Sequence, residues 1–239
     1  MERLPKSEVQ QFYNARKLIR SPDDIWSNHS YAEIDRFLDC IPTESYSGFG
    51  LNAGSADIGF GIERSASDVI YLDIAYNLLP IDALSVGGDV ERLPFPECGF
   101  DFILSVGAVL NYVDAAVTIA EFGRALKSGG FLILQFETTQ SLEFIGTNTF
   151  RRSAEIVWTK YDGKQHRQWV YSRAYIFNIL RANGFSILRK QHYHIASPIF
   201  LRLEWLNIGM KYIFALDHWL NVTPLARFSE SVIILAKKV

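Results

Sequence analysis

Residues 88–101 read Gly88-Asp89-Val90-Glu91-Arg92-Leu93-Pro94-Phe95-Pro96-Glu97-Cys98-Gly99-Phe100-Asp101, and this stretch decides the predicted fold. It lies downstream of the apolar run Val69-Ile70-Tyr71-Leu72, which Asp73 closes. One acidic residue therefore ends a predicted strand, a second follows the next strand, and a turn leads into a third apolar run. Because parallel strands present their carboxyl ends along one edge of a sheet, the pattern predicts a nucleoside pocket on that edge.

Apolar runs alternate with helical stretches over most of the chain. Predicted strands cover residues 49–53, 69–74, 84–87, 100–106, 131–136, 185–192 and 231–237, and predicted helices cover 114–127 and 172–183. Ser128-Gly129-Gly130 is expected to end the first helix, with glycine as its left-handed cap. Asp162-Gly163 predicts a hairpin between residues 156–161 and 165–171. The alternation indicates an α/β fold of the doubly wound type.

The two ends of the chain carry helical additions to this sheet. Helices are expected from Glu8 to Ile19 and from Asp24 or Ser30 to Cys40. The whole chain, 1–239, is interpreted as one domain, with an N-terminal helical cap (1–45), a cofactor-binding core (46–138) and a substrate-side half (139–239). At this length one domain with additions is favoured over two.

An apolar insertion, residues 198–227, precedes the last predicted strand. It is expected to form one long or two shorter amphipathic helices, with Arg202, Lys211, Glu204 and Asp217 on its polar side. A helical cover is favoured, and a substrate lid or an interface in a homodimer is the alternative. Membrane association through this insertion is disfavoured, because the charges are mixed rather than strongly basic.

Composition narrows the range of partners and compartments. The net charge of −2 leaves no basic excess for neutralising phosphates, so nucleic acid is not expected as a partner. Cys40 and Cys98 have no metal-ligand spacing, and no metal site is expected. The cysteine usage and the lack of an apolar leader at the start predict a cytoplasmic location.

Five segments carry a resemblance to a known family. They are Leu51-Asn52-Ala53-Gly54-Ser55, Tyr71-Leu72-Asp73-Ile74, Gly88-Asp89-Val90-Glu91-Arg92-Leu93-Pro94-Phe95, Phe100-Asp101-Phe102-Ile103-Leu104-Ser105 and Glu121-Phe122-Gly123-Arg124-Ala125-Leu126-Lys127-Ser128-Gly129-Gly130-Phe131-Leu132. In this order they resemble the class I S-adenosylmethionine-dependent methyltransferases. The resemblance implies a Rossmann-like sheet of seven strands, mostly parallel, whose last strand is antiparallel.

The same resemblance implies S-adenosylmethionine as the cofactor and a set of residues that contact it. Gly54 and Ser55 would line its methionine part, Asp73 would bind the ribose, and Asp89 would bind the adenine amino group. The full expected set is Asn52, Gly54, Ser55, Ala56, Asp73, Ile74, Asp89, Val90, Ser105 and Val106.

The chain departs from the family pattern at two places near the expected site. Ala56 stands where many relatives have glycine, and Asn111-Tyr112 replaces a pair that is often Glu-His. No general base is therefore assigned by the resemblance. The candidate bases are His29, His166, His192 and His194, and His29 is preferred because it lies in a polar segment before a helix; His192 and His194 are interpreted as surface residues.

Three aromatic residues of the predicted cap, Tyr13, Trp26 and Tyr31, are candidates to face the cofactor's sulfonium, although packing of the cap is the simpler interpretation. The predicted function is methyl transfer to a small molecule or a biosynthetic intermediate, with a glycan or lipid-linked acceptor among the candidates. The alternative is a non-catalytic domain of the same fold that binds the cofactor or a partner. A nicotinamide dehydrogenase is disfavoured, because Ala56 breaks the glycine fingerprint.

Overall fold

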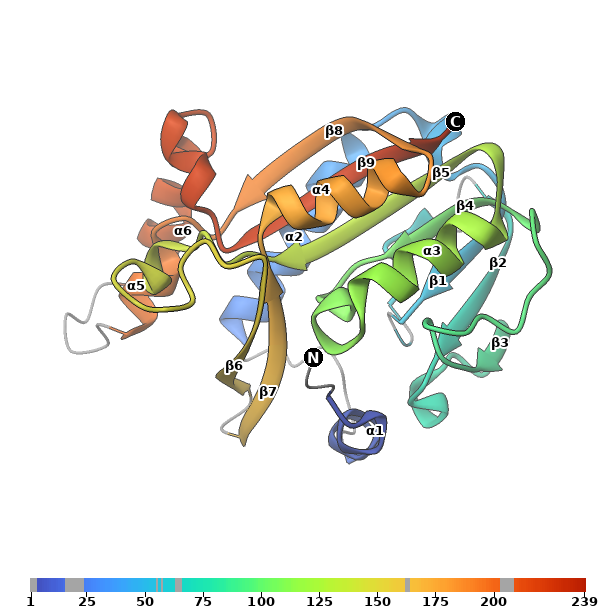
Figure 1. Cartoon of the computed structure of the whole chain (residues 1–239), viewed down its shortest axis with the longest axis horizontal. Helices are drawn as coiled ribbons and strands as arrows, with labels where there is room; N and C mark the ends of the chain where they lie inside the picture. The colour runs from blue at the N-terminus through green and yellow to red at the C-terminus, as the bar shows by residue number, and fades with distance from the viewer. Residues whose placement is uncertain are drawn as a thin grey trace.

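The computed structural model describes residues 4–15, 24–54, 56, 58–62, 66–161, 164–202 and 209–239. A seven-stranded sheet crosses the molecule (Figure 1). It consists of β1 (Gly48–Ala53), β2 (Ala66–Asp73), β3 (Leu84–Gly87), β4 (Phe100–Ser105), β5 (Leu126–Glu137), β8 (Phe185–Tyr193) and β9 (Ser231–Lys238). The strand order is β3-β2-β1-β4-β5-β9-β8, and β9 is antiparallel to both of its neighbours. The other four neighbouring pairs, β3–β2, β2–β1, β1–β4 and β4–β5, are parallel, which confirms the predicted fold class.

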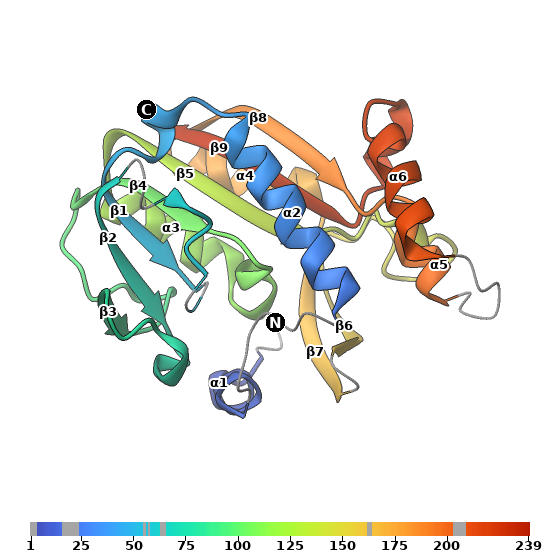
Figure 2. The same cartoon turned by 180° about the vertical axis from the view of Figure 1, so that it is seen from behind.

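Helices cover both faces of the sheet. α3 (Ala115–Ala125) and α4 (Arg173–Ala182) lie on the face nearer the viewer in Figure 1, and α2 (Ile25–Asp39) crosses the opposite face, as Figure 2 shows. Phe122 of α3 and Leu180 of α4 are fully buried in one apolar layer, and Ile34 and Phe37 of α2 are fully buried in the other. A central strand buried on both faces needs apolar side chains where it is covered, as residues 102–104 of β4 and 132–134 of β5 provide.

Side-chain caps explain where these helices begin. Asp24 accepts the backbone N–H of Ser27 at the start of α2, and Asp114 accepts that of Ala116 at the start of α3. Ser172 caps α4 in the same way. An oxygen at this position satisfies a backbone donor that has no partner within the helix. The predicted start of the second helix at Asp24 is therefore confirmed, and Ser30 lies inside it.

The predicted end of the helix at 114–127 is wrong. α3 ends at Ala125, and β5 begins at once at Leu126, which pairs with Phe100 before the register shifts. Gly129 does adopt a left-handed backbone, with φ of +80°, but it does so within a bulge of β5 rather than at a helix cap. A glycine that tolerates positive φ serves either purpose, and pairing with β4 decides between them here.

The remaining elements lie around the carboxyl edge of the sheet. α1 (Lys6–Asn14) lies below this edge in Figure 1, and the hairpin of β6 (Ala154–Tyr161) and β7 (Lys164–Tyr171) forms a separate two-stranded sheet. The hairpin is confirmed, although its predicted turn at 162–163 lies outside the described residues, as does the end of the helix predicted from Glu8 to Ile19. Between β1 and β2, the described residues form no α-helix.

The insertion forms two helices, α5 (Ser197–Arg202) and α6 (Met210–Leu220), followed by the 3-10 turn η7 (Pro224–Phe228). Its core is a small cluster that includes Ile195 and Leu220. The expectation that Asp217 lies on the polar side is wrong, because this residue is 2% exposed and points inward. Glu204 lies outside the described residues. Within the ranges given above, no helix is long and apolar enough to cross a bilayer.

Candidate active site

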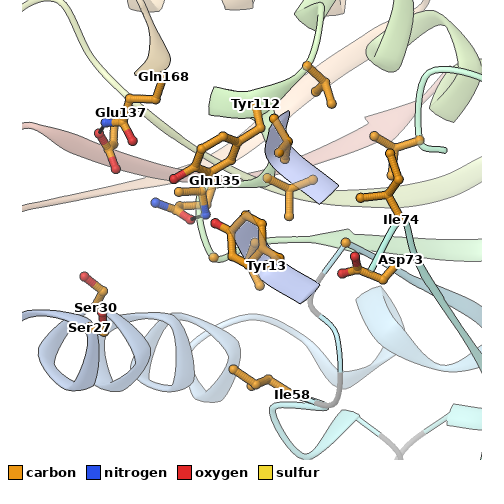
Figure 3. A pocket seen from close by; sticks show the side chains of 18 of the residues that line it. Tyr13, Ser27, Ser30, Ile58, Asp73, Ile74, Tyr112, Gln135, Glu137 and Gln168 are labelled. Carbon is orange, nitrogen blue, oxygen red and sulfur yellow. Dashed lines mark hydrogen bonds between the residues drawn. The ribbon is translucent and has the colours of Figure 1, made fainter. Parts of the chain in front are cut away.

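One cavity lies along the carboxyl edge of the sheet (Figure 3). The loops after β1, β2 and β4 supply one side of it, and the end of β5, His166 and Gln168 of β7 and the start of β9 supply the other. α1 and α2 add side chains from the N-terminal cap. The sequence prediction of a pocket on this edge is therefore confirmed in position. The cavity extends beyond the strand ends, because residues of α1, α2 and β7 also line it.

Asp73 anchors one side of the cavity. It ends β2 and is 9% exposed, and its two carboxylate oxygens accept the backbone N–H groups of Ala56 at 3.0 Å and Ala75 at 2.8 Å. Burial raises the pKa of Asp73, and the backbone hydrogen bonds oppose that rise. The carboxylate is held in place by backbone N–H groups of the turns after β1 and β2, and it lines the cavity.

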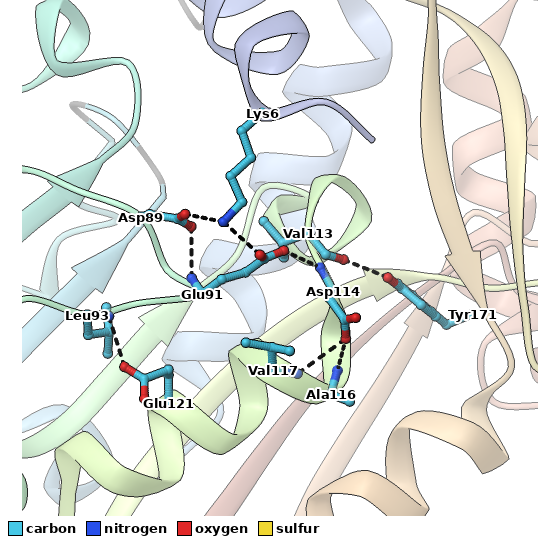
Figure 4. Close-up of polar contacts among 10 residues, drawn as sticks. All are labelled: Lys6, Asp89, Glu91, Leu93, Val113, Asp114, Ala116, Val117, Glu121 and Tyr171. Carbon is cyan, nitrogen blue, oxygen red and sulfur yellow. Dashed lines mark hydrogen bonds and ion pairs between the residues drawn. The ribbon is translucent and has the colours of Figure 1, made fainter. Parts of the chain in front are cut away.

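Asp89 lies on the rim of the same cavity and is tied to the N-terminal helix (Figure 4). One of its oxygens accepts the N–H of Glu91 at 2.9 Å, and the other pairs with the Lys6 ammonium. Lys6 also lies 2.7 Å from the Glu91 carboxylate, and Gln10 donates to the Ile74 carbonyl at 2.9 Å. α1 therefore lies across the part of the cavity where both predicted carboxylates point.

The predicted contact residues divide into two groups. Six of them line the cavity, namely Gly54, Asp73, Ile74, Asp89, Val90 and Val106. Asn52, Ala56 and Ser105 do not line it: they lie behind the wall, each 2% exposed or less. Asn52 donates to the Ile58 carbonyl at 2.9 Å, and Ala56 donates to Asp73, so both support the wall. Ser55 lies outside the described residues.

Gly54, directly after β1, faces Val109 of the loop after β4. Its φ is +84°, and a Cβ there would lie 2.5 Å from Cγ1 of Val109. Carbon atoms do not approach this closely, so a side chain at position 54 would displace Val109 from the cavity wall. The small residue predicted at this turn is therefore required both by the backbone conformation and by the space.

A tyrosine and a histidine meet on the opposite side of the cavity. The Oη of Tyr112 lies 2.8 Å from Nε2 of His166, which β7 supplies. The rings of Tyr13 and Tyr112 pack edge to face, with centroids 5.5 Å apart. A pocket histidine is thus present, although it comes from the hairpin rather than from the position where relatives carry one.

Two carboxyl groups line the cavity near this pair. Glu137 ends β5 and accepts a hydrogen bond from the Gln168 amide, and Glu230 immediately precedes β9. Burial raises the pKa of Glu137 to about 8, with a smaller contribution from Glu143. Burial also raises the pKa of Glu230, and Glu137 adds to that rise.

The sequence analysis did not identify Gln135, Glu137, Gln168 or Glu230 as site residues. The signal that could have found Gln168 is the period of two in β7, since His166 and Gln168 are buried on one face. The three aromatic candidates of the cap, Tyr13, Trp26 and Tyr31, all line the cavity.

The preferred base does not line the cavity. His29 stacks on Phe214 at 3.8 Å and lies 3.6 Å from the Glu33 carboxylate, and burial lowers its pKa. The surface interpretation of the other two histidines is also wrong. His194 is fully buried, and His192 lies 3.0 Å from the Ser229 hydroxyl, where burial lowers its pKa to about 4. His194 lies beyond the end of β8 with φ of +53°, so the two rings do not share a strand face.

Comparison with known proteins bears on the same part of the chain. Residues 48–134 match the family model described as a methyltransferase domain. A Bacillus subtilis (strain 168) protein, provisionally described as a 23S rRNA (guanine-N(1)-)-methyltransferase, is 33% identical over 105 residues. That alignment covers 42% of this chain and 33% of the relative, so the chain matches only a third of the relative's length.

Solved structures resemble nearly the whole chain. An S-adenosylmethionine-dependent methyltransferase from Mesorhizobium loti has a TM-score of 0.55 at 17% identity, over 87% of this chain and 97% of that one. The 1,6-didemethyltoxoflavin-N1-methyltransferase from Burkholderia thailandensis, solved with its substrate and S-adenosylhomocysteine, has a TM-score of 0.53 at 13% identity, over 98% and 86%. At these identities the likeness concerns the fold.

The match over residues 48–134 covers the strands and loops that form the Asp73 side of the cavity. The sheet order and its antiparallel β9 belong to the same fold as the solved methyltransferases. Residues 48–134 therefore match a methyltransferase domain, and the chain as a whole has the fold of the solved S-adenosylmethionine-dependent methyltransferases.

Proposed function

We propose that this chain transfers a methyl group from S-adenosylmethionine to a small-molecule acceptor held in the described cavity. The observation that carries the proposal is that a single cavity joins two different surfaces. One is the Asp73 edge within the matched family region, and the other is the polar wall of Tyr112, His166 and Glu137. Residues 1–239 would act as one domain, in which the C-terminal half supplies the acceptor side.

The residues on the Asp73 side fit the adenosyl group. The Asp73 carboxylate, which lines the cavity, would accept from the ribose hydroxyls, and Ile74 would offer an apolar surface to the adenine ring. Gly54 lines the cavity where the methionine part would lie, and a side chain there would displace Val109 from the cavity wall. Asp89 would accept from the adenine amino group, with Val90 beside the ring and Val106 near the amino-acid end. Asn52, Ala56 and Ser105 would act by supporting this wall.

When bound, S-adenosylmethionine supplies an activated methyl group on a sulfonium whose departure leaves a neutral thioether. The protein's own task is to align the acceptor and exclude water, which can lower a barrier by up to ~7–11 kcal/mol in ideal geometry. Tyr13, Trp26 and Tyr31 would face the positive charge, each interaction contributing about 0.5–2 kcal/mol. His166, whose Nε2 lies 2.8 Å from the Tyr112 hydroxyl, would serve as the base that takes a proton from the acceptor.

Calorimetry with S-adenosylmethionine, S-adenosylhomocysteine and NAD tests the cofactor. Binding of the first two at micromolar Kd, without binding of NAD, is the expected result. An acceptor screen that follows the release of S-adenosylhomocysteine then tests turnover. Cofactor binding with no release for any acceptor class would favour the non-catalytic alternative, and an absence of cofactor binding would overturn the proposal.

The Bacillus subtilis relative raises a second candidate, an RNA acceptor. The charge of this chain argues against it, since the net value of −2 leaves no basic excess for neutralising RNA phosphates. A screen that includes ribosomal RNA stripped of methyl groups tests this directly. Transfer to RNA, at a rate above that for small molecules, would replace the proposed acceptor class.

A further inference from the structure

A chain of hydrogen bonds runs from the insertion to the cavity wall. The Asp217 carboxylate on α6 accepts the hydroxyl of Ser197, and also its backbone N–H at 3.3 Å. The Ser197 hydroxyl oxygen lies 2.9 Å from Nδ1 of His194, and Nε2 of His194 lies 2.9 Å from the Ser30 hydroxyl on α2. His194 and Ser197 are fully buried, and Asp217 is 2% exposed.

The Asp217 carboxylate, at the buried end of this series of hydrogen bonds, determines which group donates in each bond. A carboxylate only accepts, so Ser197 donates to Asp217 and its oxygen must accept from Nδ1–H of His194. Burial holds the pKa of His194 well below its usual range, and the nearby His29 adds to this, so the imidazole is neutral. Nε2 then has no hydrogen, and Ser30 must donate to it.

The Ser30 hydroxyl, which is the cavity end of this series of hydrogen bonds, therefore has a fixed orientation. Ser30 lines the cavity, and its only hydrogen is directed at His194, so its oxygen presents lone pairs to a ligand. Figure 3 shows Ser30 on α2, apart from Asp73 and Ile74 across the cavity. The Trp26 indole stacks on His194 at 3.7 Å with an interplanar angle of 9°, which fixes the ring from the same helix.

We propose that Ser30 is a specificity-determining hydrogen-bond acceptor, and that His194, Ser197 and Asp217 are positioning residues that hold it in this polarity. The pocket would then select acceptor substrates that present an O–H or N–H group toward α2. The inference rests on the proposed function, because it assigns the acceptor side of that same cavity. It also assigns a role to the insertion, since Asp217 lies on α6.

Asp217→Asn tests the polarity with a side chain of the same shape. The new amide would donate to Ser197, Ser197 would donate to Nδ1, and the hydrogen of His194 would move to Nε2. Ser30 would then accept from His194 and offer its own hydrogen to the cavity. Nitrogen NMR of labelled histidine is expected to report Nδ1–H in the unmodified protein and Nε2–H in the variant.

Binding of two probes tests the consequence for ligands, using protein saturated with S-adenosylhomocysteine. Phenol offers an O–H, whereas anisole has only an acceptor oxygen. The unmodified protein is expected to prefer phenol, Ser30→Ala to lower the phenol-to-anisole affinity ratio about tenfold, and D217N to shift it toward anisole. Ser85→Ala is the control, because the Ser85 hydroxyl donates to the Pro80 carbonyl at 2.9 Å and this residue does not line the cavity; its ratio is expected to stay unchanged.

Equal ratios in the unmodified protein and S30A would overturn the inference, and so would an Nε2–H tautomer in the unmodified protein. If D217N does not fold, S30A and the tautomer measurement on the unmodified chain still decide the question. Failure of S-adenosylhomocysteine to bind would instead count against the proposed function, so the two failures are distinguishable.

Discussion

The Oη of Tyr112 lies 2.8 Å from Nε2 of His166 inside the cavity, although the two residues are 54 positions apart in the chain. Tyr112 belongs to the short turn after β4, and His166 belongs to the β6–β7 hairpin. Asn111 holds the two segments together, since its amide donates to the Trp169 carbonyl at 2.7 Å and its oxygen accepts the Glu137 N–H at 3.2 Å. The hairpin thereby supplies the cavity with a histidine in a fixed position.

Removing the tyrosine hydroxyl should weaken methyl transfer without unfolding the chain. Tyr112→Phe is expected to lower kcat about fivefold, because one hydrogen bond contributes roughly 1 kcal/mol to the position of His166. The measurement is release of S-adenosylhomocysteine with the acceptor found by screening. Tyr175→Phe is the control, since that hydroxyl lies on α4 outside the cavity lining. Full activity in Y112F would show that the Tyr112–His166 contact has no part in turnover.

Alanine variants of two glycines in the cavity lining distinguish the energetic cost of backbone strain from the cost of a steric clash. Gly54 and Gly107 have φ of +84° and +79°, but a Cβ at position 54 would lie 2.5 Å from Val109, whereas one at 107 would have no atom within 4 Å. Either alanine should cost about 1–2 kcal/mol of unfolding free energy through the left-handed backbone. Gly54→Ala should cost a further ~1–3 kcal/mol from overpacking.

Urea denaturation of both variants measures this difference, and Val109→Ala in the G54A background should recover most of the additional loss. Equal losses in G54A and G107A would mean that the turn after β1 is not packed against Val109 in solution.

The raised pKa of Glu137 predicts a pH-dependent stability. Its pKa rises from an ordinary 4.5 to about 8, so the folded chain holds this proton more tightly than the unfolded chain. The resulting stabilisation is complete below about pH 4.5 and is lost as the pH rises to about 8. The free energy of unfolding of Glu137→Gln should therefore fall less between pH 5 and pH 8 than that of the unmodified chain.

Urea titrations at several pH values between these limits test the prediction. Glu155→Gln, a variant of a carboxylate on β6 that pairs with Arg152 at the surface, is the control and should follow the unmodified chain. Glu230 leaves part of the pH dependence in place, because burial raises its pKa as well. Identical pH slopes for E137Q and the unmodified chain would contradict the burial of this group.

The sheet and its helices could be predicted from the sequence because their signals are local. Apolar runs mark the strands, and Asp24, Asp114 and Ser172 mark the helix starts. The predicted helix cap at Gly129 was wrong because a left-handed backbone occurs both in caps and in bulges, and only the pairing of β5 with β4 distinguishes the two.

The acceptor side of the cavity could not be predicted, because it depends on contacts between distant segments. His194 and Asp217 look like surface residues in the sequence, yet Ser30 and Ser197 satisfy their hydrogen bonds in the interior. The polarity of these side chains alone predicts that they are exposed. They are buried instead because helices α2, α5 and α6 supply their hydrogen-bond partners.

The most direct test of the account is the affinity of S-adenosylhomocysteine for Asp73→Ala, measured by calorimetry beside Asp101→Ala. Asp101 also accepts a backbone N–H, that of Phe49 at 2.9 Å, but it does not line the cavity. Loss of charge-assisted hydrogen bonds to the ribose should raise the Kd of D73A at least ~30-fold, while D101A should bind as the unmodified chain does. Unchanged affinity in a folded D73A protein would contradict the assignment of this cavity to the adenosyl group.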